Sequence, residues 1–470
     1  MLPRFETVGR LRPVDLVAPG AVQVDDAEPA AGERATPAPA PYVAAVAELD
    51  DEAGDPVRID LLGDDVRLSA HCDPGRRRGW LEIDTLGATT RHRSRRSGTA
   101  PAAGPPVSAV ALVLTGPLVT VLTREGGESW TARARCDLQD RVDVHDETWL
   151  AGLRTCLSPG TPGATAGRPP VRRLLAGGFG QLGLRDLRLV STLDGEPVRD
   201  GDRLLLTATS AGPGFFPTAH TSVWALDPRR PTLEHRADLF FRRPDRPGVF
   251  GDHATHLVRD GDRWLVATST WADFDTQRNP TVAVTLAETG ADLLRGRHVL
   301  DTRALPLPTD GLESVGVWDP HLLRHDDRWY VGFVSASRWF RFHPALASGP
   351  SLDELRLDGA ATDRTATEGT TLVRLDDGWH VLASDGRDNP RPFRARYPVL
   401  DLALEEVGVL DAPYPTNLPW PTLVRERTRD GDGWLLVTFD GTPYGGRLVG
   451  YGSHGDVVLA RTLPPVGREE

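Results

Sequence analysis

The sequence predicts an all-β protein in which a five-bladed β-propeller is preceded by a small β-sandwich. Three observations carry this prediction. A hairpin-like unit recurs five times from residue 185 onward, several short alternating strands crowd the first third of the chain, and a Gly- and Pro-rich stretch separates the two regions. Repeats of this size, each unable to bury both of its faces alone, are typical of radially arranged blades.

The clearest copy of the repeat runs from Gly316 to Ser335. It has an acid at its start, Asp319, an apolar strand, the acidic turn Asp326-Asp327 and a second, aromatic strand. Period-two apolar residues around a two-residue acidic turn predict a β-hairpin. The other four copies begin at Arg185, Gly251, Thr367 and Leu418.

Four of the five copies have a carboxylate at their start. These residues are Asp186, Asp252, Asp319 and Glu368, whereas the fifth copy has Pro421. An acid that opens a strand often only caps the preceding turn. Because the first strand of every propeller blade lines the central channel, four acids at one repeat position favour a functional ring at the channel mouth instead.

The rest of the chain divides by composition. Residues 1–42 lack sustained periodicity and are predicted to be a disordered or loosely packed lead. Residues 43–157 are predicted to form the jelly-roll-like sandwich, 158–170 a linker, and 171–470 the propeller. The basic stretch RHRSRRSG that begins at Arg91 is interpreted as a solvated loop, and the acid-rich segment 137–153 as a solvated connection.

Composition excludes several classes of function. Lysine is absent, which excludes Schiff-base catalysis and a phosphate-binding loop of the lysine type. The net charge of −12 opposes binding to nucleic acid or to an anionic membrane surface. The three scattered cysteines indicate reduced thiols. Without a long apolar run or a signal-peptide core, we expect a cytoplasmic protein with no membrane partner.

A ring of carboxylates suits glycosidic bond hydrolysis. Inversion needs one carboxylic acid that protonates the leaving oxygen and one carboxylate, roughly 6.5–9.5 Å away, that activates water. Mutual repulsion separates the pKa values of clustered acids, so that one stays protonated near neutrality. The expected partner is therefore an oligosaccharide or glycoside.

The dipeptides Asp319-Pro320 and Glu368-Gly369, in this order, resemble those of glycoside hydrolase family 43 and its relatives. The resemblance covers the repeat region only. It implies a five-bladed propeller that cleaves arabinofuranosyl or xylosyl bonds with inversion, with Asp186 as general base, Asp319 as modulator of pKa and orientation, and Glu368 as general acid. It implies no cofactor.

This sequence departs from the family pattern at two places. Asp186 is followed by Leu187 instead of Pro, and Thr370 follows the Glu-Gly dipeptide. Asp252 is therefore a competing candidate for the base. The family also places a His near the channel floor, sometimes beside a calcium ion, and His454 is the nearest match. No metal ligands are predicted from the residues themselves.

Aromatic side chains outside the blade cores are predicted to form the sugar platform, because apolar sugar faces stack on rings. An Arg near them is expected to bond hydroxyl groups. The predicted substrate-binding residues are Phe215, Trp271, Trp318, Trp339, Trp420, Arg338 or Arg391, Asp252 and His454.

Two other functions remain open at this point. A retaining fructan-type hydrolase also uses two Asp and one Glu on a propeller, although its W-x-N-D-P opening motif is missing here. A propeller that binds a glycan without cleaving it is the alternative outside enzymes. The sequence leaves the sugar, the linkage and the oligomeric state undetermined.

Overall fold

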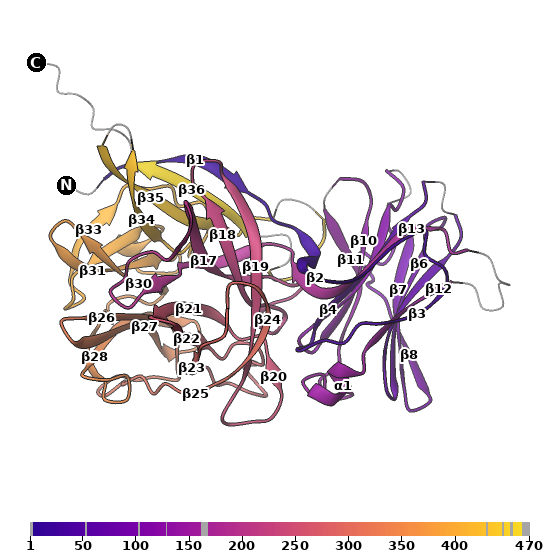
Figure 1. The fold of residues 1–470 in the computed structure, drawn as a ribbon, viewed down its shortest axis with the longest axis horizontal. Helices are drawn as coiled ribbons and strands as arrows, with labels where there is room; N and C mark the ends of the chain where they lie inside the picture. Colours follow the sequence, from indigo (N-terminus) through magenta and orange to yellow (C-terminus); the bar gives the residue numbers. More distant parts are fainter. Residues whose placement is uncertain are drawn as a thin grey trace, which may run out of the picture.

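The computed structural model describes residues 3–51, 54–101, 104–127, 129–160, 168–428, 431–443, 446–451 and 455–462. Within these ranges the regular elements are strands, apart from helix α1 (Glu147–Ala151) and two 3-10 turns at Phe216–Thr218 and Arg391–Phe393. The all-β prediction is confirmed. No helix among the described residues is both long and apolar enough for a membrane span. The strands gather into two lobes (Figure 1).

The small lobe holds two six-stranded sheets with a common core. The first has the order β11-β10-β9-β4-β13-β2, and the second β3-β12-β5-β6-β7-β8. Buried Ile59, Leu81, Leu112 and Leu157 belong to the core that the two sheets share. The strands are β2 (Asp15–Ala27), β3 (Gly32–Ala35), β4 (Tyr42–Leu49), β5 (Val57–Gly63), β6 (Val66–Asp73), β7 (Arg78–Thr85), β8 (Ala88–His92), β9 (Ala109–Thr115), β10 (Leu118–Arg124), β11 (Trp130–Asp137), β12 (Arg154–Pro159) and β13 (Val171–Gln181).

The large lobe holds five further sheets, which we number in chain order. The first contains β14 (Leu184–Leu189), β16 (Arg199–Asp200), β17 (Arg203–Ser210), β18 (His220–Asp227), β19 (Thr232–Arg242), β20 (Val249–Phe250) and β24 (Gly296–Asp301). The second contains β15 (Ser191–Thr192), β21 (His253–Asp260), β22 (Arg263–Ser269), β23 (Val284–Thr289) and β25 (Arg303–Ala304).

The remaining three sheets have four strands each. The third is β26 (Gly316–His325), β27 (Arg328–Arg338), β28 (Arg341–Gly349) and β29 (Arg356–Ala360). The fourth is β30 (Thr367–Leu375), β31 (Gly378–Asp385), β32 (Tyr397–Leu400) and β33 (Glu406–Leu410). The fifth is β34 (Thr422–Thr428), β35 (Gly431–Asp440), β36 (Asp456–Thr462) and β1 (Phe5–Leu11).

All five predicted hairpins are confirmed as antiparallel pairs, namely β14–β17, β21–β22, β26–β27, β30–β31 and β34–β35. The acidic turn of the third pair has Asp326 and Asp327 at φ 50° and 57°. Asp tolerates this left-handed conformation, which matches the twist of the flanking strands. The first strands adjoin one another: β14 contacts β21 and β34, β21 contacts β26, and β26 contacts β30.

The predicted disordered lead is wrong. Strand β1 pairs with β36 and completes the fifth sheet, so that the two ends of the chain close the large lobe together, as Figure 1 shows in indigo and yellow. Arg10 and Arg12 reinforce this pairing through Asp440 and Asp456. Strands β2 and β3 pair with β13 and β12 of the small lobe. Long-range partners thus order a segment with no local periodicity.

The predicted start of the repeat region at residue 171 is also too early. Strand β13 lies between β4 and β2 in the small lobe, and the large lobe resumes at β14. The pattern of apolar residues in Val171–Gln181 does not indicate which of the two lobes this strand joins. The two small-lobe partners of this strand therefore move the boundary past Gln181.

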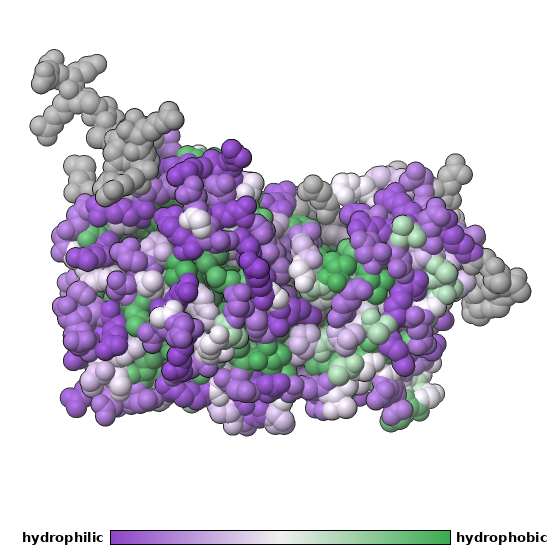
Figure 2. Space-filling model, viewed as in Figure 1, coloured by the Kyte–Doolittle hydropathy of each residue, from purple (hydrophilic) through white to green (hydrophobic). Residues whose placement is uncertain are grey.

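The two lobes pack directly on each other. The buried Tyr42 hydroxyl donates to the carbonyl oxygens of Ala219 (2.8 Å) and Pro217 (3.1 Å), and its ring stacks on Phe240. Arg297 of the large lobe donates to the Tyr42 carbonyl oxygen (3.1 Å). One apolar cluster includes residues of both lobes. In the view of Figure 2 the remaining surface is mainly polar, with hydrophobic atoms in small separate patches.

Candidate active site

Four first strands of the large lobe carry a β-bulge at the same place. The register shifts lie between Arg185 and Arg188, His253 and His256, Trp318 and His321, and Glu368 and Thr371. One residue inside each bulge has a positive φ: Asp186 at 51°, Ala254 at 61°, Asp319 at 57° and Gly369 at 73°. A bulge re-aims side chains, and such bulges are frequent beside active sites.

The positions of these bulges correct the alignment of the repeat copies that the sequence indicated. Asp186 and Asp319 occupy the same position of the bulge, as predicted. Glu368, however, lies one position earlier, and Asp252 lies two positions before the corresponding Ala254. Because alternate residues of a strand face opposite sides, the offset of one position re-aims Glu368. The offset of two places Asp252 ahead of the bulge instead of inside it.

The structure brings together Asp186, Asp319 and Glu368. Asp319 is buried, and its Oδ2 accepts a hydrogen bond from the Gly369 N–H (3.2 Å). Burial first, and then the carboxylates of Glu368 and Asp186, raise the pKa of Asp319 well above its usual range. Burial and the nearby Asp186 also raise the pKa of Glu368, to about 7. Asp186 and Glu368 are partly exposed, so solvent reaches the cluster.

Trp420, in the connection between β33 and β34, holds the Glu368 carboxylate. Its Nε1–H donates to Glu368 Oε1 (3.4 Å), while the indole is 2% exposed. The hydrogen bond favours the ionised form of Glu368 and opposes the rise of its pKa. Trp420 was predicted to stack against the sugar. Because it is buried, its role is instead to position the Glu368 side chain.

Two arginines that sequence reasoning missed accompany the acids. Arg188 is buried and donates to the carbonyl oxygens of Asp319 (3.0 Å) and Thr370 (2.9 Å) and to Thr371 Oγ1 (3.0 Å). Burial lowers its pKa to about 10. Arg185 lies over the rings of Tyr451 and Phe439, at 4.4 and 4.7 Å. The position of Arg185 directly before Asp186 is the sequence feature that could have identified it as a site residue.

Tyr451 is a further missed residue. It lies between β35 and β36, and the three acids raise the pKa of its hydroxyl, although burial is the larger cause. Its ring makes edge contacts with Phe215 and Phe216 (5.9 and 5.7 Å). No local pattern marks this residue, because a loop far along the chain carries it to the acids.

The predicted aromatic residues form one wall next to Asp319. The Trp318 ring lies 5.1 Å from Trp271 and 6.3 Å from Trp339, and Trp271 stacks on Phe216 at 4.5 Å. Trp318 and Trp271 are 3% and 8% exposed, so they support the wall from behind. Trp339 and Phe216 are half-buried and present the accessible edges.

Three other predicted ligands do not join the cluster. Phe215 is 53% exposed and meets the site only through the edge of Tyr451. Arg338 is exposed at the end of β27, in the turn to Arg341. Arg391 begins the 3-10 turn after β31. His454 lies outside the described residues.

Asp252 is not part of the carboxylate cluster. Arg243 binds it bidentately, with Nε to Oδ2 at 2.8 Å and Nη2 to Oδ1 at 2.5 Å, and both residues are buried. Arg243 also donates to Asp273 (2.6 Å). Burial raises the pKa of Asp252, and its charged neighbours are Arg243 and Asp273 instead of the three acids. Its predicted roles as alternative base and substrate ligand are therefore wrong.

The described residues beside the acids do not fit a calcium ion. Calcium takes oxygen ligands, mostly carboxylates and carbonyls. Here two stacked imidazoles, His256 and His321 (4.0 Å between centroids), accept backbone N–H groups through Nδ1. The guanidinium of Arg188 already binds the carbonyl oxygens of Asp319 and Thr370. Arg188 therefore supplies the positive charge that a calcium ion would bring to this place.

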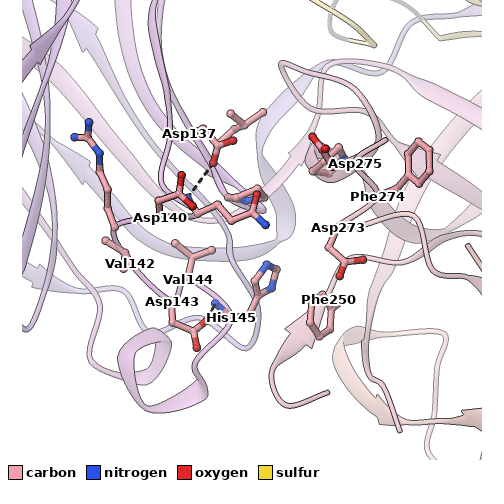
Figure 3. Close-up of a pocket in the computed structure, with 15 residues that line it drawn as sticks. Asp137, Asp140, Val142, Asp143, Val144, His145, Phe250, Asp273, Phe274 and Asp275 are labelled. Carbon is pink, nitrogen blue, oxygen red and sulfur yellow. Dashed lines mark hydrogen bonds between the residues drawn. The ribbon is translucent and has the colours of Figure 1, made fainter. Parts of the chain in front are cut away.

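A separate pocket of about 470 Å³ lies between the lobes (Figure 3). Asp137 to His145 face Phe250 and Asp273 to Asp275 across it. Arg278 pairs with Asp140 (3.2 Å), Arg243 pairs with Asp273, and Asp143 caps the backbone of His145. Asp137, Asp140 and Asp143 are exposed, as expected for a solvated connection, and none of the three clustered acids lines the pocket.

No protein-family model matches the chain, and no curated protein matches it in sequence. Solved structures with a similar fold include a family 117 glycoside hydrolase of Zobellia galactanivorans, with 11% identity, a TM-score of 0.41, and 60% of this chain and 84% of that chain covered. A family 43 enzyme of Xanthomonas citri has 14% identity and a TM-score of 0.39, with 60% and 93% covered. A family 32 β-fructofuranosidase of Bombyx mori has 14% identity and a TM-score of 0.41, with 60% and 61% covered. The chain thus spans less than two thirds of the length of the last enzyme.

Proposed function

We propose that the large lobe is a five-bladed β-propeller, that the small lobe is a β-sandwich, and that the protein is a glycoside hydrolase that cleaves a pentosyl bond with inversion. One observation carries the proposal. Carboxyl groups from three of the four bulged strands, β14, β26 and β30, lie together, and the pKa of Glu368 is raised to about 7. A group with this pKa can both give and take a proton at neutral pH.

The roles follow from burial and neighbours. Glu368, protonated in part at neutral pH and held by Trp420, donates its proton to the leaving oxygen. Asp186, partly exposed on the first sheet, accepts a proton from the attacking water. Asp319, buried and bonded to the Gly369 N–H, orients the strand that carries Glu368. After burial, the Glu368 carboxylate raises the pKa of Asp319.

The substrate is proposed from the wall and the resemblance. Trp339 and Phe216 offer aromatic edges for the apolar face of a sugar ring. The dipeptides Asp319-Pro320 and Glu368-Gly369 favour an arabinofuranosyl or xylosyl residue. Neither feature requires a cofactor.

The proposal is tested with a panel of aryl pentosides and hexosides and a matching natural disaccharide. Wild type should cleave one sugar class, and Glu368→Gln should lose disaccharide hydrolysis by a factor of about 100 or more, because a natural leaving group needs protonation. Aryl substrates should suffer less, since aryl leaving groups need little protonation. The control Glu405→Gln, at an exposed glutamate before β33, should match wild type.

Two outcomes would contradict this function. If no sugar is cleaved while one still binds, the carboxylates form a recognition site and the protein is a glycan-binding propeller. If Glu368→Gln cleaves the disaccharide as fast as wild type, Glu368 is not the general acid.

A retaining fructan-type hydrolase is the second candidate. The observation that favours it is that Asp186 is the charged group that raises the pKa of Glu368, after burial. Nucleophile and acid of a retaining enzyme lie close together, roughly 5–5.5 Å apart. The anomeric form of the first product distinguishes the two. It is followed by proton NMR for a pentose and by carbon-13 NMR for fructose, whose anomeric carbon carries no hydrogen. Inverted product supports the first candidate, and retained product together with fructoside cleavage supports the second.

A further inference from the structure

A second pocket, of about 710 Å³, lies on another part of the seam between the lobes. The loop after β8 and strand β11 form its small-lobe side, and Pro213 with the segment 447–449 forms its large-lobe side. We call it the arginine pocket. Its lining comprises Arg91, His92, Arg93, Ser94, Arg96, Ser97, Ala132, Ala134, Arg135, Pro213, Arg447, Leu448 and Val449.

Three of its arginines carry uncompensated charge. Arg96, Arg135 and Arg447 have no ion pair within the described part of the chain, and the one hydrogen bond of their guanidinium groups there is a long one from Arg447 to the Arg96 carbonyl oxygen (3.5 Å). Nearby arginines behave differently: Arg91 pairs with Glu82, and Arg133 pairs with Glu125. Three unpaired cations in one hollow are unexpected in a protein of net charge −12.

The backbone around these arginines is held in place. Ser94 N–H donates to the Arg133 carbonyl oxygen (2.8 Å), and Gly98 N–H donates to the Ser94 carbonyl oxygen (2.9 Å). Across the pocket, Ala132 N–H donates to the Arg447 carbonyl oxygen (2.9 Å). A fixed backbone reduces the entropy lost when a ligand binds.

The arginine pocket shares a wall with the carboxylate cluster. Segments 213–216 and 447–451 run side by side, and Tyr451 N–H donates to the Gly214 carbonyl oxygen (2.5 Å). Pro213 and Val449 line the arginine pocket, whereas Phe216 and Tyr451 belong to the candidate active site. A ligand in the pocket therefore lies next to the proposed sugar site.

We propose that the arginine pocket binds the oxyanion of an acidic saccharide, that is, a carboxylate, sulfate or phosphate group carried by a sugar. Each guanidinium offers several N–H donors in a fork that matches such groups, and charge-assisted bonds of this kind are the stronger ones. The volume suits a small ligand and not an extended polyanion. At physiological salt the screening length is about 8 Å, so the local arginines outweigh the distant negative charge.

The saccharide identity rests on the proposed glycosidase function, whereas recognition of the oxyanion does not. The test is therefore binding, measured by calorimetry on full-length Glu368→Gln so that turnover is suppressed. The first probe is trigalacturonate, with its methyl ester as the neutral match. The next two are galactose 6-sulfate and galactose 6-phosphate, with galactose as their neutral match. The last probe is inorganic sulfate. Absence of hydrolysis in wild type would contradict the proposed function and leave these affinities unaffected.

At least one acidic saccharide should bind about tenfold tighter than its neutral match at low salt, and the difference should shrink at 0.5 M NaCl. Adding Arg96→Gln and Arg135→Gln together should remove that tenfold gain. The added control Arg95→Gln, an exposed neighbour that does not line the pocket, should leave it intact. Thermal unfolding of each variant verifies folding.

Three results would overturn the proposal. The first is equal binding of every acidic saccharide and its neutral match. The second is an unchanged acidic preference in the folded double variant. The third is inorganic sulfate binding as tightly as every acidic saccharide, which would identify a free-anion site.

Discussion

Two groups of acids in the large lobe differ in their electrostatics. Asp252 belongs to a group with Arg243, Asp273 and Arg246, in which the guanidinium groups contact both carboxylates directly. Asp319 belongs to a group with Asp186 and Glu368, whose nearest buried cation, Arg188, bonds to backbone carbonyl oxygens. Asp252 directly precedes β21, whereas Asp319 lies inside the bulge of β26.

Under the proposed function, this difference separates a structural acid from a reactive one. A carboxylate with a bidentate arginine is neutralised within its pair, and its proton affinity is of little chemical use. Carboxylates that face one another raise each other's pKa values and hold a proton where chemistry needs it. The number of direct cation contacts per carboxylate, visible only in the fold, distinguishes the two.

The largest expected effect is on activity at the like-charged group. Asp186→Asn should lower kcat for the cleaved glycoside by about 1,000-fold, because the amide cannot accept the proton of water. Asn tolerates the left-handed backbone at φ 51°, so the melting temperature should stay close to that of wild type. Steady-state kinetics and thermal unfolding measure both. Activity within tenfold of wild type would remove Asp186 from the mechanism.

The matched change in the paired group should affect stability instead. Asp252→Asn leaves Arg243 buried with one carboxylate fewer, which should cost about 3 kcal/mol of folding free energy. The activity of the folded enzyme should remain within about threefold of wild type. Urea denaturation with activity assays below the transition tests this. An unchanged unfolding midpoint with a 100-fold activity loss would make Asp252 a catalytic candidate again.

The smallest expected effect is a pH-dependent change in stability. Folding raises the pKa of Glu368 from an ordinary 4.5 to about 7, so the folded protein holds a proton that the unfolded chain releases across this interval. This group therefore lowers stability as pH rises from about 4.5 to 7. Glu368→Gln should melt on the order of 2 °C higher than wild type at pH 8 but not at pH 4.5. An equal difference at both pH values would contradict the raised pKa.

The sequence by itself determined the elements that depend on neighbouring residues. Alternating apolar residues and acidic turns located all five hairpins, and Asp326-Asp327 suit the turn that joins β26 and β27. Asp186, Asp319 and Glu368 were identified because they start such hairpins. Local pairing and turn chemistry leave these features little freedom.

Only the tertiary structure decided what depends on distant partners. The bulges displaced Glu368 and Asp252 from the position of Asp319, and the partner of Asp252, Arg243, directly follows β19 of the first sheet. Strand β1 was ordered by pairing with β36, at the other end of the chain. Tyr451 reached the acids on a loop with no repeat pattern. Such contacts depend on how the strands close together, which a periodic pattern in one segment does not encode.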